Sequence, residues 1–150
     1  MKTRNLDGSI VMGMIEGCGT VVDRAVAVKA IRAVCRYFGG QMLYIPVHKT
    51  TGAATEELHG LLRDAVGDRD AGRILEKLMA MFGGYQVYIP MEKSAFRNAI
   101  AGEIYERYDG DHKTIGDLCR EYGISFNTMY RLYYLGRDNK TQTEFQFDET

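Results

Sequence analysis

The chain has 150 residues, of which 45% are hydrophobic, and a formal net charge of −1 at pH 7. This length can bury one sizeable core or two small ones. The near-neutral charge argues against strong non-specific binding to polyanions, which requires a large basic excess. No stretch reaches the roughly 18 apolar residues of a membrane span, so we expect no membrane partner and a cytoplasmic location.

The cysteines and histidines do not form a recognisable reactive or metal-binding pattern. The three cysteines include no CxxC pair and leave an odd number, which favours a reducing compartment. The three histidines are scattered along the chain. No nucleophile stands at a recognisable spacing from a general base. We therefore expect no metal, no cofactor and no catalytic residues, and a protein that is not an enzyme.

The first third of the chain predicts two helical segments followed by a short strand. Residues 10–15 form an apolar run, and residues 23–38 carry apolar side chains at the spacing of a helix that stops at Gly39 and Gly40. Residues 41–45 then favour an extended strand. Pro46 closes it, because proline cannot occupy an interior position of a ladder.

The same pattern returns 44 residues later. Residues 37–46, YFGGQMLYIP, align with residues 81–90, MFGGYQVYIP. Two helices, at residues 56–66 and 68–82, precede the second strand at residues 85–89. The paired glycines end a helix and let the backbone reverse. Their spacing lacks the pattern of a phosphate-binding loop, so we interpret them as structural.

Each strand is too short to be stable alone, so we expect the two to pair antiparallel, within one chain or across a dimer. Alternation places Gln86 and Tyr88 on one face and Tyr85, Val87 and Ile89 on the other. Met42 stands where the second copy has Gln86. This difference predicts that the first strand packs while the second presents polar groups.

After Pro90, Ser94 is the expected N-cap of a helix over residues 94–108. A turn follows, and residues 114–135 predict two further short helices. Thr114 is the expected N-cap of the first helix, and Gly123 is expected to end it in a left-handed turn. Ser125 is the expected N-cap of the second helix. The polar tail after residue 136 is expected to be disordered or to form a short strand at residues 143–147.

The last of these helices separates an apolar face from a polar one. At 100° per residue, Met129, Leu132 and Tyr133 fall inward, and the opposite face carries Asn127, Tyr130, Arg131 and Tyr134. Two helices with a sharp turn are typical of a helix-turn-helix, whose second helix enters the major groove. The alternative is an ordinary helical hairpin. The amide, phenol and guanidinium groups of the outer face favour DNA reading, because they suit base edges.

The predicted DNA-contacting residues are exposed polar or aromatic side chains of this motif and of the second strand. They are Gln86, Tyr88, Lys113, Thr114, Ser125, Asn127, Thr128, Tyr130, Arg131, Tyr134 and Arg137. Gln86 and Tyr88 are expected at the minor groove, with a purely structural Tyr88 as the alternative. Between residues 113 and 140, five basic residues stand against three acidic ones, so we expect two heads on a palindromic site to be needed for tight binding.

The segment GGYQVYIP at residues 83–90, followed at this distance by residues 115–132, resembles the Mor/C family of phage activators of middle and late operons. The resemblance implies a homodimer that binds double-stranded DNA beside a promoter and contacts RNA polymerase. It implies an N-terminal dimerisation region, which we place at residues 1–91. The repeat found in the sequence divides this region into copies at 10–47 and 55–91. A three-helix DNA-binding head at 92–136 and a tail at 137–150 complete this organisation. The overall class is mainly α with short β-strands, α+β.

Two departures from the family pattern affect these expectations. The glycine–strand–proline unit occurs twice, and the tail is acidic rather than basic. Two alternatives to the transcription regulator therefore stand: an interaction scaffold that does not bind DNA, and a DNA-binding accessory factor of packaging or recombination. Binding to random DNA would separate the first alternative from the regulator, and footprints near a promoter would separate the second.

Overall fold

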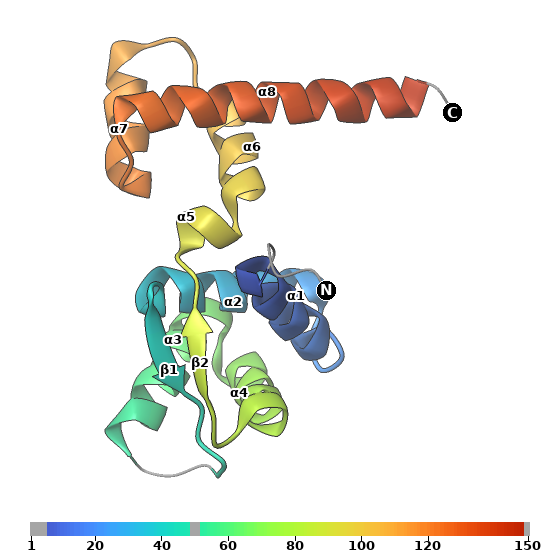
Figure 1. Ribbon diagram of the computed structural model, residues 1–150, viewed down its shortest axis with the longest axis vertical. Helices are drawn as coiled ribbons and strands as arrows, with labels where there is room; N and C mark the ends of the chain where they lie inside the picture. Colours follow the sequence, from blue (N-terminus) through green and yellow to red (C-terminus); the bar gives the residue numbers. More distant parts are fainter. Residues whose placement is uncertain (1–5, 49–51, 149–150) are drawn as a thin grey trace. The chain divides into compact units, whose positions relative to one another are not determined.

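The computed structural model describes residues 6–48 and 52–148, and the side chains of residues 10–48 and 52–141. Over this part of the chain it is mainly helical and contains a two-stranded antiparallel sheet, in agreement with the expected α+β class (Figure 1). The chain divides into two compact units, residues 1–95 (unit 1) and residues 96–150 (unit 2).

Unit 1 contains five helices and two strands within the described residues. In order they are α1 (Leu6–Cys18), α2 (Arg24–Phe38), β1 (Gln41–Tyr44), α3 (Ala53–Val66), α4 (Asp68–Phe82), β2 (Gln86–Ile89) and α5 (Glu92–Ala95). The bounds of α2, α3 and α4 confirm the helices expected from apolar spacing. α1 is longer than the apolar run that predicted it, because it begins at Leu6 rather than near residue 10.

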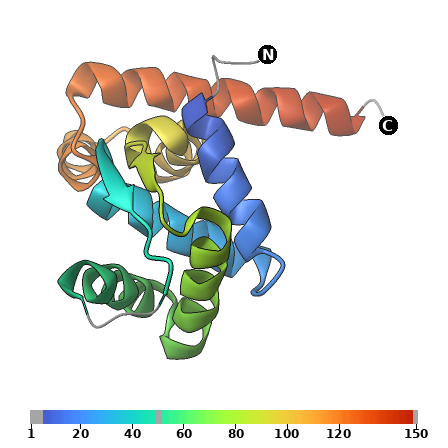
Figure 2. The same ribbon diagram turned by 60° about the horizontal axis from the view of Figure 1, so that its bottom comes forward.

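The helices of unit 1 form one core. α1 packs against α2 and α4, and α3 packs against α4 and α2. Figure 2 shows α1 beside α4. The fully buried side chains of this core include Met14, Ile31, Leu62 and Leu75. Burial of these apolar side chains is the main stabilising contribution to the unit.

The two strands pair within the chain, which decides between the two arrangements left open by the sequence. β1 and β2 are antiparallel, with Leu43 opposite Val87. Their inner face buries Leu43, Ile45, Val87 and Ile89, and in Figure 1 the strands lie in front of α2 and α3. The alternation expected along the second strand is confirmed for residues 86–89. The inner position expected for Tyr85 is wrong, because this residue precedes β2 and is 70% exposed.

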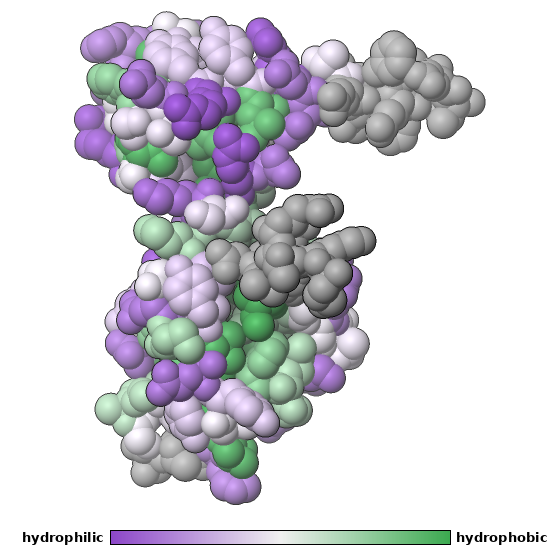
Figure 3. Space-filling view, in the orientation of Figure 1, coloured by the Kyte–Doolittle hydropathy of each residue, from purple (hydrophilic) through white to green (hydrophobic). Residues whose placement is uncertain are grey.

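The expected contrast between a packing strand and a presenting strand is wrong. Met42 and Tyr44 of β1 are 53% and 49% exposed, and Tyr88 of β2 is 45% exposed. Both strands bury one face and present the other, because the helices cover one side of the sheet. In the space-filling view, apolar and pale residues lie beside purple ones on this side, so the open face is amphipathic (Figure 3).

The single helix expected over residues 94–108 is wrong, since the chain forms two helices there. α5 ends at Ala95, and α6 (Arg97–Arg107) begins after Phe96, whose φ of −114° and ψ of 31° are not helical. Ser94 lies inside α5, and the N-cap position of α6 is Phe96. The Phe96 side chain is 8% exposed, so the residue at which the helix is interrupted is buried.

Unit 2 is a three-helix core of α6, α7 (His112–Tyr122) and α8 (Phe126–Asp148). Its buried residues come from all three helices: Ile100, Ala101, Ile104, Ile115, Leu118, Met129 and Leu132. Arg107 joins α6 to α7 through two hydrogen bonds of 2.7 and 2.8 Å to the Glu121 carboxylate. The Tyr122 hydroxyl also donates to Glu103 at 2.7 Å.

The expected end of the last helix near residue 136 is wrong, and so is the strand or disorder expected at residues 143–147. α8 continues to Asp148. Gly136 is buried inside it, and a Cβ there would lie 2.8 Å from the Tyr105 Cβ of α6. The glycine therefore permits close packing of α8 on α6 rather than ending the helix.

Candidate nucleic-acid interface

The turn between α7 and α8 has the geometry that the sequence predicted. Gly123 adopts a left-handed conformation with φ 63° and ψ 44°, and its N–H bonds to the Cys119 carbonyl. The Ile124 N–H reaches the same carbonyl at 3.0 Å. Ile124 packs against the core of unit 2, as expected. The direction of α8 is thus set by a short turn and by a partly buried side chain.

α8 begins with the cap that was expected at Ser125. The Thr128 N–H donates to the Ser125 Oγ at 3.2 Å, and the Ser125 hydroxyl donates to the Thr128 Oγ1 at 3.0 Å. Both residues were predicted to contact DNA. Their hydroxyl groups here stabilise the start of the helix.

The cap of α7 differs from the one expected. Asp111 is the N-cap, and its carboxylate accepts a hydrogen bond from the Lys113 N–H at 3.2 Å. Thr114 lies inside the helix. Hydrogen bonds from the Asp111 N–H and from the Thr114 side chain lower the pKa of the Asp109 carboxyl. Thr114 therefore stabilises the loop before α7.

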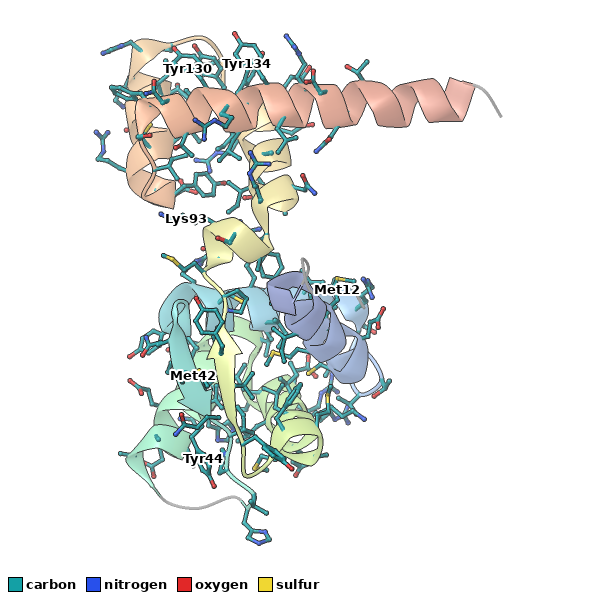
Figure 4. The ribbon with its side chains drawn as sticks, viewed as in Figure 1. Met12, Met42, Tyr44, Lys93, Tyr130 and Tyr134 are labelled. Atoms are coloured by element: carbon teal, nitrogen blue, oxygen red, sulfur yellow. The ribbon has the colours of Figure 1, made fainter. Side chains whose placement is uncertain are left out.

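The outer face of α8 presents the side chains that helical periodicity placed there. Asn127 and Arg131 are exposed, as are Tyr130 at 38% and Tyr134 at 48%, whereas Met129 is fully buried. Figure 4 shows Tyr130 and Tyr134 on the same side of α8. This face joins an amide, two phenols and a guanidinium.

Aromatic contacts hold two of these side chains in place. The Tyr130 ring meets the Tyr108 ring edge-on, with centroids 6.1 Å apart. A hydrogen bond with Tyr130 is the main cause that raises the pKa of Tyr108. The Arg137 guanidinium lies over the Tyr134 ring, 4.8 Å from its centroid. The two exposed tyrosines are therefore supported by neighbours rather than free to sample all rotamers.

The basic residues of unit 2 differ in whether an acid compensates them. Arg107, Arg120, Arg137 and Lys140 each form an ion pair with a neighbouring carboxylate. Over the side chains that the structure describes, Arg97, Lys113 and Arg131 form none. Arg131 thus combines exposure, a place on the outer face of α8 and an uncompensated charge.

An open hollow of about 540 Å³ lies between the start of α7 and the first residue of α8. Its lining residues are Asp111, His112, Lys113, Gly116, Arg120 and Phe126. Phe126 is 53% exposed. Neither His112 nor Phe126 was among the residues predicted to contact DNA. Phe126 could have been found from the sequence, because it is a large apolar residue directly after the Ser125 cap, on an otherwise polar face of α8.

The predicted residues therefore fall into two groups. Gln86 and Tyr88 lie in unit 1, on the open face of the sheet. The other predicted residues belong to α7, α8 and the turn between them, in unit 2. Among the residues that the structure describes, no group of three or more His, Cys, Asp or Glu side chains could hold a metal ion, and no helix is long and apolar enough to cross a membrane.

Comparison with known proteins identifies the family of the chain. A family model described as the Mor transcription activator family matches residues 47–144, more than half of the chain. The match includes α3, α4, β2 and all of α6 and α7. Neither the curated proteins nor the solved structures gave a match to the chain. The chain belongs to the Mor transcription activator family.

Proposed function

We propose that this protein is a sequence-specific regulator that binds double-stranded DNA and activates transcription. α7 and α8 are the two helices of a helix-turn-helix, and α8 enters the major groove. The observation that carries the proposal is the outer face of α8, where Asn127 and the uncompensated Arg131 project from a helix whose opposite face is buried. An amide and a guanidinium are the groups that read adenine and guanine edges.

Charge explains why base contacts must contribute much of the affinity. Most arginines of unit 2 are already paired with carboxylates, so few cations remain to neutralise phosphates. Because non-specific affinity follows the number of neutralised phosphates, it is modest for this unit. Lys113 and the hollow at the start of α7 are the proposed phosphate contacts, since an exposed lysine and helical N–H groups lie there.

Unit 1 contributes a second, smaller contact in this proposal. Gln86 and Tyr88 lie two residues apart on the open face of β2, and Tyr88 is 45% exposed. The amide and phenol can donate to the acceptor atoms of the minor groove. Because the chain belongs to a family of transcription activators, the proposal also includes a contact with RNA polymerase.

The expectation of two heads on a palindromic site is a separate question. It was based on the small basic excess between residues 113 and 140, and the strands were expected to pair either within one chain or across a dimer. Here β1 and β2 pair within one chain. The proposed function needs one DNA-reading unit and does not depend on a strand exchange.

The test uses a duplex selected from random sequences by the wild-type protein. Arg131→Ala should weaken binding to this duplex by about 1–3 kcal/mol, because a bidentate base contact is lost. Its thermal stability should be unchanged, since the side chain is exposed. Asn127→Ala should instead relax the choice of base at one position.

Arg73→Ala is the matched control, because it removes one exposed arginine from α4 of unit 1. It should leave the affinity for the selected duplex unchanged. If selection enriches no sequence, the protein is not a specific DNA reader and the scaffold alternative is supported. If it enriches a sequence but Arg131→Ala binds it normally, another face of the protein reads DNA.

A further inference from the structure

The two aligned segments of the chain face each other across a local two-fold axis. With a spacing of 44 residues, Val87 is the counterpart of Leu43, and these two residues are opposite each other in the ladder. Tyr44 pairs with Gln86, and Met42 pairs with Tyr88, so the flanking positions are exchanged. Such a pattern is that of an isologous interface, in which residue i meets residue j and j meets i.

The paired glycines repeat this exchange at both ends of the sheet. The Gly40 N–H donates to the Ile89 carbonyl at 2.7 Å, and the Gly84 N–H donates to the Ile45 carbonyl, also at 2.7 Å. Each bond joins the glycine pair of one copy to the strand end of the other. In each copy, the glycine at the backbone reversal is thus hydrogen-bonded to the other copy.

The glycines before them make reciprocal close contacts as well. A Cβ at Gly39 would lie 2.8 Å from the Met91 Cα and 3.2 Å from the Pro90 carbonyl oxygen. A Cβ at Gly83 would lie 3.2 Å from the Pro46 carbonyl oxygen and 3.3 Å from the Val47 Cα. These contacts correspond position by position, because Pro90 and Met91 are the counterparts of Pro46 and Val47.

The helices follow the same symmetry. The buried positions that α2 and α4 share at the 44-residue spacing are Ala27 with Ala71, Ala30 with Ile74, Ile31 with Leu75, and Val34 with Leu78. α1 packs against α4, and α3 packs against α2, so the first helix of each copy packs against the second helix of the other. The symmetry therefore extends through the core of unit 1.

We infer that unit 1 is an intramolecular pseudo-dimer: α1–α2–β1 and α3–α4–β2 form a closed two-fold pair within one chain. The pair carries one copy of α6–α8, so one chain offers one reading unit to an asymmetric DNA site. The last step depends on the proposed function, whereas the closure of the pair does not. The match to the family begins at residue 47, directly after Pro46. α1, α2 and β1 therefore lie outside the matched region and supply the second half of a symmetric interface.

The closure can be tested in the full chain with Met42→Cys, Tyr88→Cys. The two positions are opposite each other and both side chains are exposed. Neighbouring Cα atoms of an antiparallel pair lie about 4.5–5.5 Å apart, which suits a disulfide. Mild oxidation should give an intrachain disulfide, seen as a faster-migrating monomer on a non-reducing gel. A disulfide-linked dimer would show that the strands are exchanged between chains and would overturn the inference.

The native thiols should interfere little with this reaction. Burial raises the pKa of Cys18 to about 11 and that of Cys35 to about 12, so both are poor nucleophiles at neutral pH. The single variants Met42→Cys and Tyr88→Cys control for Cys119. Tyr44→Cys, Tyr88→Cys is a matched control, because these two residues share the open face but are not opposite each other. It should form the disulfide much more slowly.

The number of reading units is tested separately. Light scattering at micromolar concentration should give the mass of one chain, 16.9 kDa. Titration of the selected duplex should saturate at one chain per site, and the enriched sequence should lack two-fold symmetry. A dimer in solution, or a palindromic site occupied by two chains, would overturn the single-unit conclusion. The gel and the light scattering need no DNA, so their outcome does not depend on the proposed function.

Discussion

The two copies in unit 1 agree where they are buried and differ where they meet solvent or α5. Ile45 and Ile89 occupy corresponding positions and are 0% and 1% exposed. In contrast, Met42 corresponds to Gln86 on the open face, and Arg32 of α2 corresponds to Glu76 of α4. The buried strand position is thus the same in both copies, whereas residues outside the core differ in charge and polarity.

The clearest divergence is at Glu92 of α5, which forms an ion pair with two arginines of α2. Glu92 of α5 accepts a hydrogen bond of 2.6 Å from the Arg32 Nε and one of 2.8 Å from the Arg36 Nη2. Its counterpart in the first copy is His48, which is exposed. These bonds hold α5 against α2, and α5 is the segment that connects the second copy to unit 2. The difference shows that the symmetry of the packed core does not extend to the charged residues at its edge.

The largest expected effect tests the shared core. Ile45→Ala and Ile89→Ala should each lower the free energy of unfolding by about 2–5 kcal/mol, because both remove a fully buried side chain. If the packing is as symmetric as the backbone pairing, the two values should be similar. Chemical denaturation followed by circular dichroism measures both.

Val47→Ala and Met91→Ala are the matched controls, since these corresponding side chains are 54% and 45% exposed. Each should change the stability by no more than about 0.5 kcal/mol. A large difference between the two isoleucine variants would show that the symmetry of the ladder does not extend to the packing energy.

The next effect concerns the ion pair at Glu92. Burial alone would raise the pKa of this carboxyl, but hydrogen bonds from Arg36 and Arg32 outweigh it and lower the pKa. Glu92→Gln should lower the stability by about 1–3 kcal/mol at pH 7. Because the folded pKa is depressed, the loss should be complete above the ordinary carboxyl pKa of about 4.3 and should vanish as the pH falls through the lowered value.

His48→Gln gives the comparison at the corresponding position of the first copy. It should leave the stability unchanged at both pH values, since His48 is exposed. Denaturation curves at neutral and acidic pH measure the two variants together. An equal loss for both, or a loss for Glu92→Gln that persists in acid, would contradict the role of this ion pair.

The smallest effect concerns the open face of the sheet and depends on the proposed function. Tyr88→Phe should weaken binding to the selected duplex by about 0.5–1.5 kcal/mol through the lost hydroxyl. Tyr44→Phe should do the same if both halves of the face meet DNA. The double variant Gln86→Ala, Tyr88→Phe should lose more affinity. Fluorescence anisotropy measures these differences.

All three variants should keep the thermal stability of the wild type, because Tyr44 and Tyr88 are about half exposed. Tyr85→Phe, at a residue that is 70% exposed just before β2, is the control. If stability and affinity fall together, the strand is only part of the scaffold. If only Tyr88→Phe has an effect, the functional face belongs to the second copy alone.

Much of the fold was predictable because its local signals are strong. Paired glycines and prolines marked the ends of α2, α4 and both strands, and apolar spacing marked the faces of α8. The antiparallel pairing followed from the repeat, but its place within one chain did not. Intrachain and interchain pairing satisfy the same backbone groups, so the strand sequences alone cannot distinguish them.

Two of the wrong predictions have a common physical cause, which is tertiary packing that overrides a local preference. Gly136 suggested a helix end, but close contact with α6 keeps it inside α8. Ser94 suggested a cap, but the helix breaks at the buried Phe96 instead. Thr114 was the predicted cap of α7, but Asp111 caps the helix instead, because its carboxylate accepts a hydrogen bond from the Lys113 N–H. The exposed side chains of α8 were predictable from helical periodicity. The ion pairs that neutralise most of the arginines of unit 2 were not.

The pairing of β1 with β2 inside one chain also determines how the protein responds to dilution. An obligate homodimer loses folded protein as its concentration falls, because association is a bimolecular step and its stability follows mass action. Here the second half of the interface is tethered to the first. Its effective concentration is fixed by the connecting chain and is independent of copy number. Unit 1 therefore has the same folded fraction whether a cell contains a few molecules or many, and its melting temperature does not change on dilution.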